Sequence, residues 1–507
     1  MCFLAAAGRI QAENYQGCNW QQAFSKLECL LEKSEYDAVV VGSGPNGLAA
    51  ALEIARTGRS VAVIEAHETI GGGMRTGEVT LPGFLHDICS SVHPLGIASP
   101  FFRSVNLSNY GLEWVHPRYC AAHPFDDGSA AVLDRSVDVT AESLGDDARA
   151  YHRTMDPWLD VWEFLLEELL GPFPLPPRRP FLLARFGLQA LPSAQTYVNR
   201  YFKGERAKAF FAGMAAHSIQ PLENIVSASF GLMLSLLGHV VGWPVARGGS
   251  QSLANALAGE LTAAGVKICT GWKVNSLDEL PPSRAVLLDV TPRQVLDITG
   301  ERFPDAYRRQ LGRYRYGPGI FKIDWALSEP VPWRAEECRQ AGTVHLGGTY
   351  EEIALSERLI GQGKHPEIPF VLFVQPSRFD RSRAPEGKEV GWAYCHVPNG
   401  STVDMTDRIE AQIERFAPGF KDCILARRVW STRDLESYNP NYIGGDINGG
   451  MQDLLQFFTR PTLQLTPYRT PDPGIYICSS STPPGGGVHG MCGYHAARTA
   501  LRYAFNS

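Results

Sequence analysis

The pattern of apolar and polar positions is clearest near the start of the chain, where an apolar run precedes a glycine cluster. Residues 36–41 form a short run rich in valine, which suits a strand buried on both faces. Residues at helical spacing and a glycine cap follow: Leu48, Leu52, Ala55 and Gly58. Residues 61–64 then form a second apolar run. The pattern predicts a strand, a turn, a helix and a strand over residues 36–65.

Farther along, the pattern separates a helical section from a section of strands. Residues 141–235 are predicted to be mostly helical, with one apolar face formed by Trp158, Val161, Trp162, Leu165 and Leu169. Alternation in residues 317–327, 370–375 and 390–397 is typical of antiparallel strands, which we expect to form the floor of a substrate domain.

Residues 224–246 contain no charged side chain unless His239 is protonated, and they are long enough to raise the question of a membrane span. Their glycines, proline and serines instead favour a buried helix pair lining a cavity. A single span would also place the cofactor motifs described below on opposite sides of a membrane. We therefore expect a buried helix pair.

The turn after the first strand carries the pattern G-x-G-x-x-G at Gly42, Gly44 and Gly47. The first glycine allows the tight turn, the second admits a pyrophosphate, and the third lets the helix lie close to the sheet. Glu65 ends the second strand, where a carboxylate can accept hydrogen bonds from both ribose hydroxyls. With its strand, helix and acid in place, the motif predicts a dinucleotide site.

A second glycine cluster at residues 71–73 favours FAD over NAD, because it places further backbone N–H groups beside the pyrophosphate. Near the end of the chain, residues 474–478 read as a strand, 479–487 as a loop of small residues and 488–500 as a helix. The positive end of that helix, aimed at the flavin, would favour hydride uptake. The predicted cofactor-binding residues are Gly42, Ser43, Gly44, Pro45, Asn46, Gly47, Glu65, Ala66, Gly72, Gly73, Met74, Arg75, Thr76, Val274, Ser480, Gly486, Gly487, Val488 and Met491.

Several stretches together resemble a known family: VVVGSGPNGLAAA, GGGMRT, FKIDWAL, TVHLGG, NPNYIGGDINGG and TPPGGGVHGMCGYHAA. Across residues 36–505 the sequence is similar to the phytoene-desaturase-related FAD oxidoreductases, in the branch named for a pyridine nucleotide-disulfide oxidoreductase domain. The resemblance implies an α/β fold: a glutathione-reductase-type, Rossmann-like FAD domain with an interwoven substrate domain of antiparallel sheet and helices.

The resemblance also implies a discontinuous FAD domain and flavin chemistry on a hydrophobic, carotenoid-, polyene- or lipid-like substrate. We expect an N-terminal extension over 1–34, an FAD domain over 35–95, 236–300 and 460–507, and a substrate domain with a helical subdomain over 96–235 and 301–459. Desaturation, saturation and isomerisation all remain open. Disulfide chemistry is rejected because the sequence has no C-x-x-C.

The proton that accompanies hydride loss needs a base, and five residues near the motifs are candidates. They are Asp87, His93, Asn441, Asp446 and His489. No second G-x-G-x-x-G unit follows a strand, so oxygen or a quinone is the expected electron acceptor. Two alternatives stay open: a flavin amine oxidase with an aromatic cage, and a non-catalytic lipid-binding escort protein of the GDP-dissociation-inhibitor type.

Composition and charge limit the partners, the thiol state and the location that we expect. A net charge of −6 gives no reason to expect nucleic acid as a partner. The eleven scattered cysteines are predicted to be reduced thiols of a cytoplasmic protein, without a metal site, and FAD is predicted to be held non-covalently. Aromatic residues in 158–192 lie beside Arg178, Arg179 and Arg185, which suggests a peripheral membrane contact.

Overall fold

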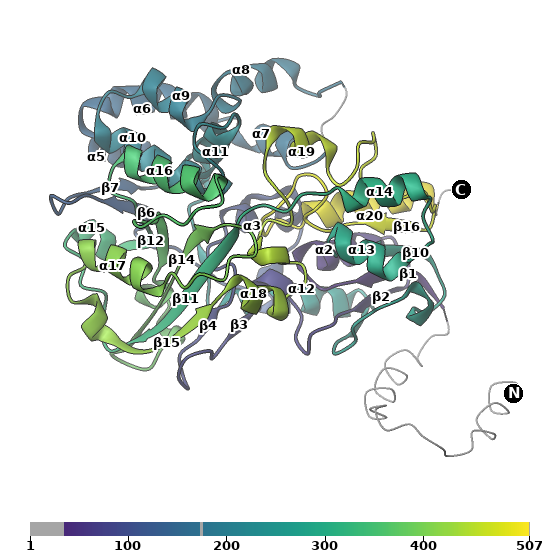
Figure 1. Cartoon of the computed structure of the whole chain (residues 1–507). Helices are drawn as coiled ribbons and strands as arrows, with labels where there is room; N and C mark the ends of the chain where they lie inside the picture. The colour runs from purple at the N-terminus through teal and green to yellow at the C-terminus, as the bar shows by residue number, and fades with distance from the viewer. Residues whose placement is uncertain (1–34, 173–175, 506–507) are drawn as a thin grey trace, which may run out of the picture.

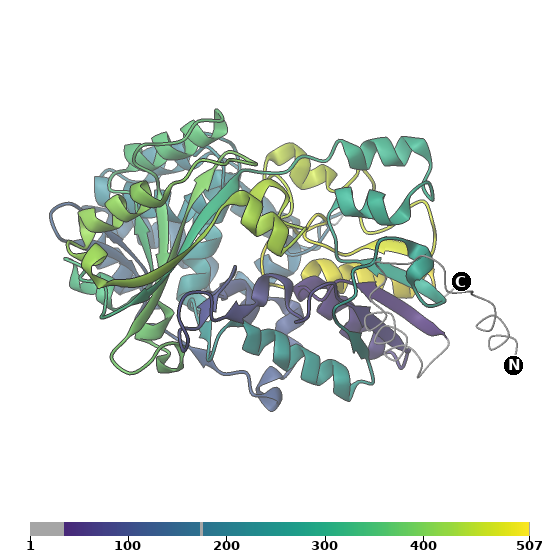
Figure 2. The ribbon, with the colours of Figure 1, turned by 60° about the horizontal axis from the view of Figure 1, so that its bottom comes forward.

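The computed structural model describes residues 35–172 and 176–505 and contains two main sheets. The predicted extension over residues 1–34 lies outside the described residues. The two sheets have five and seven strands, and they lie in different halves of the molecule in Figures 1 and 2. The fold is therefore α/β with a Rossmann-like dinucleotide-binding domain, as the sequence predicts.

The smaller sheet is formed by strands from the start, the middle and the end of the chain. Its parallel strands run in the order β16 (Ile475–Ile477), β10 (Ser283–Leu288), β1 (Tyr36–Val41), β2 (Val61–Ile64) and β9 (Lys267–Cys269). One face packs on α2 (Pro45–Ala55), α12 (Ser250–Ala263) and α20 (Met491–Tyr503). The other packs on α13 (Pro292–Thr299) and α14 (Asp305–Gly312). Both faces are covered, which explains why the strands read as continuous apolar runs.

Helices α2 and α20 cross at close range beneath this sheet. A Cβ on Gly493 of α20 would collide with the backbone of Asn46 on α2. The predicted helix over 488–500 is confirmed, although it begins at Met491 because Gly490 has a φ of +69°. The glycine contact brings the last helix of the fold against the first glycine motif.

The larger sheet has seven strands. Its order is β15 (Ile424–Trp430), β11 (Gly319–Leu327), β14 (Glu389–Val397), β13 (Val371–Val374), β12 (Ala341–Leu346), β6 (Tyr119–Pro124) and β7 (Ala130–Leu133). All neighbours are antiparallel except β12 and β6. The predicted strands over 317–327, 370–375 and 390–397 are confirmed.

Alternation along these strands separates two kinds of surface. Val344, Phe373 and Ala393 are register partners in neighbouring strands and belong to a core with α17 (Thr406–Phe416). Side chains one residue away point to the opposite face. That face carries two rows, Thr343–Val374–Trp392 and His345–Leu372–Tyr394, and it faces the cavity described below.

A helical layer covers part of the larger sheet, at the upper left of Figure 1. It comprises α5 (Val137–Ser143), α6 (Ala148–Leu159), α7 (Trp162–Leu169), α8 (Pro180–Ala190), α9 (Ala194–Tyr201), α10 (Glu205–Ala215) and α11 (Ser227–Val240). The predicted helical section is confirmed. The expected helix pair over 224–246 is wrong, because this stretch forms α11 and then the short strand β8 (Val245–Ala246). Within the described residues, no helix has the length and apolar character needed to cross a bilayer.

Short elements complete the chain. They are β3 (Thr76–Gly77), β4 (His86–Asp87), α3 (Pro94–Ala98), α4 (Pro100–Arg103), β5 (Trp114–Val115), α15 (Glu336–Arg339), α16 (Tyr350–Gly361), α18 (Thr432–Tyr438) and α19 (Leu454–Thr459). Among the described residues, seven cysteines are free thiols, in line with the prediction: Cys89, Cys120, Cys338, Cys395, Cys423, Cys478 and Cys492. Cys269 departs from that prediction because it is disulfide-bonded.

Candidate functional site

The first glycine turn joins β1 to α2 at close quarters. Gly42 has a φ of +103°, a backbone conformation that residues other than glycine rarely adopt. A Cβ on Gly44 would lie 2.7 Å from Oδ2 of Asp289, and one on Gly47 would collide with the carbonyl oxygen of Gly42. All three glycines are therefore required by local geometry. A turn of this form at a helix N-terminus is suited to a pyrophosphate.

Glu65 ties this turn to the neighbouring loop. Its Oε2 accepts from Ser43, at 2.8 Å from the backbone nitrogen and 2.6 Å from the hydroxyl. Its Oε1 accepts from the backbone of His67 at 2.8 Å and from Nη2 of Arg75 at 3.0 Å. A carboxylate offers about four acceptor positions, and these four bonds use them, so the protein itself holds Glu65 in place beside the cavity.

The second glycine cluster lies directly against the first. Gly71 donates its backbone N–H to the carbonyl oxygen of Ser43 at 3.0 Å. A Cβ on Gly72 would lie 2.9 Å from the Cα of Gly44. The two clusters thus form one continuous wall of backbone, as a site that receives an extended anionic group requires.

The tail motif contributes a further part of the cavity wall. Gly487 has a φ of +128°, and a Cβ there would lie 3.1 Å from the His489 ring and 3.2 Å from Leu95. A Cβ on Gly486 would lie 2.8 Å from the backbone oxygen of Asn448. Both positions therefore require glycine for close packing.

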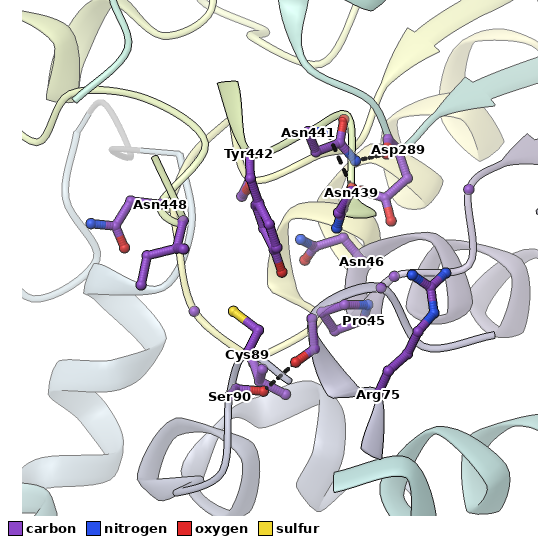
Figure 3. Close-up of a pocket in the computed structure, with 18 of the residues that line it drawn as sticks. Pro45, Asn46, Arg75, Cys89, Ser90, Asp289, Asn439, Asn441, Tyr442 and Asn448 are labelled. Carbon is purple, nitrogen blue, oxygen red and sulfur yellow. Dashed lines mark hydrogen bonds between the residues drawn. The ribbon is translucent and has the colours of Figure 1, made fainter. Parts of the chain in front are cut away.

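A cavity of about 630 Å³ brings these segments together, as Figure 3 shows from close range. Most of the predicted cofactor residues line it: Gly42, Ser43, Gly44, Pro45, Asn46, Glu65, Ala66, Gly72, Gly73, Arg75, Val274, Ser480, Gly487 and Val488. The other predicted positions lie behind the wall: Gly47, Met74, Thr76, Gly486 and Met491. Contact of these residues with a cofactor stays a prediction.

His93 is a predicted catalytic residue that lies in the cavity wall. Ser250 donates its hydroxyl to the carbonyl oxygen of Ser90 at 2.6 Å, so its oxygen must accept from Nε2 of His93 at 2.8 Å. Nδ1 of His93 is therefore the unprotonated nitrogen, and it is buried with no partner among the described residues. Burial lowers the pKa of His93 to about 4. The site thus contains a neutral imidazole with a free acceptor nitrogen.

Asn441, a second predicted catalytic residue, also lines the cavity, but its side chain is engaged. Its Oδ1 accepts from the backbone of Thr291 at 3.0 Å and from Gln294 at 2.8 Å, and its Nδ2 donates to the backbone oxygen of Asp289 at 3.2 Å. Figure 3 shows this side chain beside Asp289. These bonds suit a residue that positions the loop after β10.

The structure does not bring the other three candidates to the cavity wall. Asp87 accepts from Arg383 at 2.9 Å and from Thr76 at 2.6 Å. Although burial raises the pKa of Asp87, the Arg383 guanidinium brings it well below its ordinary value. Asp446 accepts from backbone nitrogens, and His489 uses both ring nitrogens on backbone groups. Their surroundings suit structural roles, because their hydrogen-bonding capacity is already used.

Asp289 was not predicted as a site residue, yet it lies at the centre of the cofactor end. It follows β10, and its Oδ2 accepts the backbone N–H of Gly47 at 2.9 Å. Burial raises its pKa to about 8. In the sequence, the only signal is an acid near the end of the apolar run at residues 285–290, and the contact between β10 and the glycine turn cannot be read from it.

The other end of the cavity, which we call the substrate end for the role proposed below, was not predicted either. Its walls are mainly apolar and aromatic: Val92, Leu95, Leu234, Trp243, Leu372, Val374, Trp392 and Tyr394. Trp392 and Tyr394 are stacked, with ring centroids 5.9 Å apart and planes inclined by 16°. Among the described lining residues, charged side chains occur only around the cofactor end: Glu65, Arg75, Lys273 and Asp289.

Comparison with known proteins agrees with this geometry. A sequence model described as an NAD(P)-binding Rossmann-like domain matches residues 40–105. The rat protein called pyridine nucleotide-disulfide oxidoreductase domain-containing protein 2 is 27% identical over 98% of this chain and 99% of its own. A phytoene desaturase of Fusarium fujikuroi is 25% identical over 69% of this chain and 64% of its own. Homologues of the chain therefore include both kinds of protein, as the sequence motifs indicate.

The architecture also matches solved structures. A putrescine oxidase variant with redesigned cofactor binding superimposes with a TM-score of 0.60 at 16% identity, covering 92% of this chain and 99% of that one. At this identity the likeness shows the fold alone. The chain has the fold of flavin-dependent oxidoreductases.

Proposed function

We propose that the protein is an FAD-dependent oxidoreductase that removes a hydride from a neutral, largely apolar substrate. The observation that carries the proposal is the continuity of the cavity. Its cofactor end is made of glycine backbone and one acid at the end of β2, and it opens directly into a chamber lined by apolar and aromatic side chains. A pocket of this kind accepts an apolar ligand with a few polar contacts.

The residues at the cofactor end fit FAD. Gly42, Gly44 and Gly72 line the cavity, and neighbouring protein atoms leave no room for a Cβ on any of them, so bare backbone would face the cofactor there. Glu65 lies in the cavity wall, where a ribose hydroxyl would replace one of its present partners, and the dissociable cofactor would lie across residues of the 35–95, 236–300 and 460–507 segments. FAD supplies the two-electron acceptor for a hydride.

His93 is the best-placed proton acceptor. Its Nδ1 is unprotonated and unpartnered at the cavity wall, so it can take the proton that leaves when a substrate C–H bond gives up its hydride. Oxygen or a quinone would then remove the two electrons. In an isomerisation, the hydride and the proton would instead return to the same substrate at other carbons.

The test is an absorption spectrum followed by anaerobic titration. The purified protein is expected to carry flavin at close to one per chain, released on acid precipitation because the bond is non-covalent. Lipid extracts added without oxygen are expected to bleach the flavin absorption, and oxygen or a quinone should restore it. A protein that neither retains FAD nor binds added FAD would contradict the proposal and favour a non-catalytic lipid-binding escort.

A flavin amine oxidase is the second candidate, favoured by the stacked Trp392 and Tyr394. A protonated amine would be attracted to the faces of these aromatic rings through cation–π interactions. Against it, the described wall of the substrate end offers no carboxylate. Hydrogen peroxide production with a panel of mono- and diamines would support this candidate, whereas reduction by lipids alone would support the first.

A further inference from the structure

Two buried hydrogen-bonding groups line the substrate chamber without a partner in the described part of the protein. The hydroxyl of Thr343 and the indole N–H of Trp392 have no hydrogen-bond partner among the described residues. Thr343 is 1% exposed and Trp392 is 4% exposed, and both line the cavity. Buried polar groups are normally paired, because leaving one unpaired is costly.

The two side chains share one row of the sheet. Thr343 on β12 pairs with Val374 on β13, which pairs with Trp392 on β14. Side chains of directly paired residues lie on the same face, and neighbouring strands are about 4.8 Å apart. The donors therefore flank Val374 with their Cα atoms roughly 10 Å apart.

His217 supplies the third donor. It lines the cavity, and its Nε2 lies 3.0 Å from Nε2 of His345. His345 follows Thr343 on the same face of β12, about 7 Å along the strand. Burial lowers the pKa of His217 to about 3, so the ring is neutral and one of the two imidazoles must donate to the other.

The surroundings of Nδ1 of His345, the ring nitrogen that does not face His217, decide which imidazole donates. Nδ1 of His345 is buried and unpartnered, and it faces α10 so closely that a Cβ on Gly213 would lie 2.9 Å away. Each direction leaves one unpaired N–H, on Nδ1 of either His345 or His217, and the half-buried His217, which lines the cavity, is the better place for it. The His345 proton therefore belongs on Nε2, donated to His217, which leaves a proton on Nδ1 of His217 with no partner among the described residues.

We infer that this corner of the chamber binds a hydrogen-bond-accepting oxygen, a carbonyl or hydroxyl, on an otherwise apolar substrate. All three groups donate, so an oxygen acceptor matches them, whereas a pure hydrocarbon would leave them unpaired. A site built to hydrogen-bond a ligand discriminates against an analogue that lacks the bonding atom. The inference takes the chamber of the proposed function as the substrate site and narrows its substrate to an oxygenated lipophilic molecule.

The experiment compares two probes of equal shape. Decan-2-one carries the oxygen, and 2-methyldecane has a methyl group in its place. Binding of each to the flavin-loaded protein is measured by headspace gas chromatography. Thr343→Val is the main variant, because it exchanges an unpaired hydroxyl for a methyl of similar volume and should fold, as circular dichroism would verify.

Thr343→Val is expected to weaken binding of decan-2-one by about two- to tenfold while leaving 2-methyldecane unchanged or slightly tighter. Trp392→Phe, which removes the indole N–H, is the second variant and should act in the same direction. Ser218→Ala is the matched control, since its hydroxyl is also buried and unpartnered but does not line the cavity. This control should change neither affinity.

Equal loss of both probes, or no loss of either, in Thr343→Val and Trp392→Phe would overturn the inference. The flavin absorption of each sample is recorded separately. A sample without flavin contradicts the proposed function, whereas a flavin-loaded sample that does not distinguish the probes contradicts only the oxygen site.

Discussion

Ser43 donates two hydrogen bonds to one oxygen of Glu65, from its backbone at 2.8 Å and from its hydroxyl at 2.6 Å. The pair joins the end of the first strand to the end of the second and fixes the carboxylate beside the cavity. Arg75 completes the arrangement with an ion pair at 3.0 Å. Glu65 therefore holds two loops together as well as facing the predicted ribose position.

Glu65→Gln should lower FAD affinity at least tenfold, because hydrogen bonds to a charged acceptor contribute about 1.5–3 kcal/mol each. The melting temperature should also fall, since the buried Arg75 loses its charged partner. Fluorescence titration of the apoprotein with FAD measures the first effect. Glu68→Gln alters an exposed acid nearby and serves as the control. Unchanged FAD affinity in Glu65→Gln would remove Glu65 from the cofactor site.

Gly487→Val should abolish flavin retention. The residue lines the cavity with a φ of +128°, so the larger side chain meets both backbone strain and the His489 ring. Gly111→Ala isolates the strain, because Gly111 has a φ of +83° and open space around its would-be Cβ. The ratio of flavin to protein absorbance reports the outcome. A Gly487→Val protein with a normal flavin spectrum would place the tail motif outside the cofactor site.

Asp289→Asn should remove a pH dependence of stability. Burial raises the folded-state pKa of Asp289 from 3.8 to about 8, so between these values the folded protein holds a proton that the unfolded chain has lost. The free energy of unfolding therefore falls as pH rises through this window, by up to about 1.4 kcal/mol per pH unit. The amide keeps an oxygen that can accept from Gly47.

Thermal unfolding of wild type and Asp289→Asn from pH 5 to pH 9 measures this effect. The stability advantage of the variant should grow with pH and level off above about pH 8. FAD retention above pH 8 should also favour the variant, because an ionised Asp289 would repel the pyrophosphate. Parallel pH curves for the two proteins would show that Asp289 is ionised across the range.

Helix α8 should bring the protein to anionic membranes. Phe181 and Leu188 on α8 are 90% and 75% exposed, and Arg178 and Arg185 are exposed beside them. The helix lies at the outer edge of the helical layer in Figure 1. Apolar side chains next to cationic ones suit insertion among anionic headgroups. Trp158 and Phe186, which the sequence also assigned to this surface, are buried and pack against each other.

Co-sedimentation with phosphatidylserine vesicles should exceed that with phosphatidylcholine vesicles and decline with salt. Phe181→Ser combined with Leu188→Ser should reduce it, as should Arg178→Gln combined with Arg185→Gln. Arg179 is left unchanged because it pairs with Glu167. Ile368→Ser, an exposed apolar position elsewhere, is the control. Wild type that stays in the supernatant at low salt would contradict the proposal.

The cofactor half of the site was predictable because its determinants are local in sequence. A glycine turn after an apolar run, with an acid at the end of the next strand, dictates a βαβ unit and a ligand position at its turn. Gly42, Gly44 and Glu65 accordingly lie in the cavity wall. Asp289 escaped prediction because its partner, Gly47, lies 242 residues earlier in the chain.

The substrate half depends on strand pairing that the sequence does not reveal. Asp87 stood near a motif and carried a charge, but only the fold shows that Arg383, 296 residues away, neutralises it. Thr343 and Trp392 look unremarkable in sequence, because their position on one row follows from the register of three strands. A buried hydroxyl or indole group suggests a ligand contact only when the structure shows that it has no hydrogen-bond partner.

The contact between Gly493 of α20 and Asn46 of α2 has a consequence for biosynthesis. A ribosome makes α2 more than 400 residues before α20, and at roughly 5–20 residues per second the interval is tens of seconds. During that time the apolar face of α2 lacks its partner helix, and a chaperone can bind this exposed surface. The cavity wall that includes both the first glycine turn and the tail motif can form only after α20 has been made.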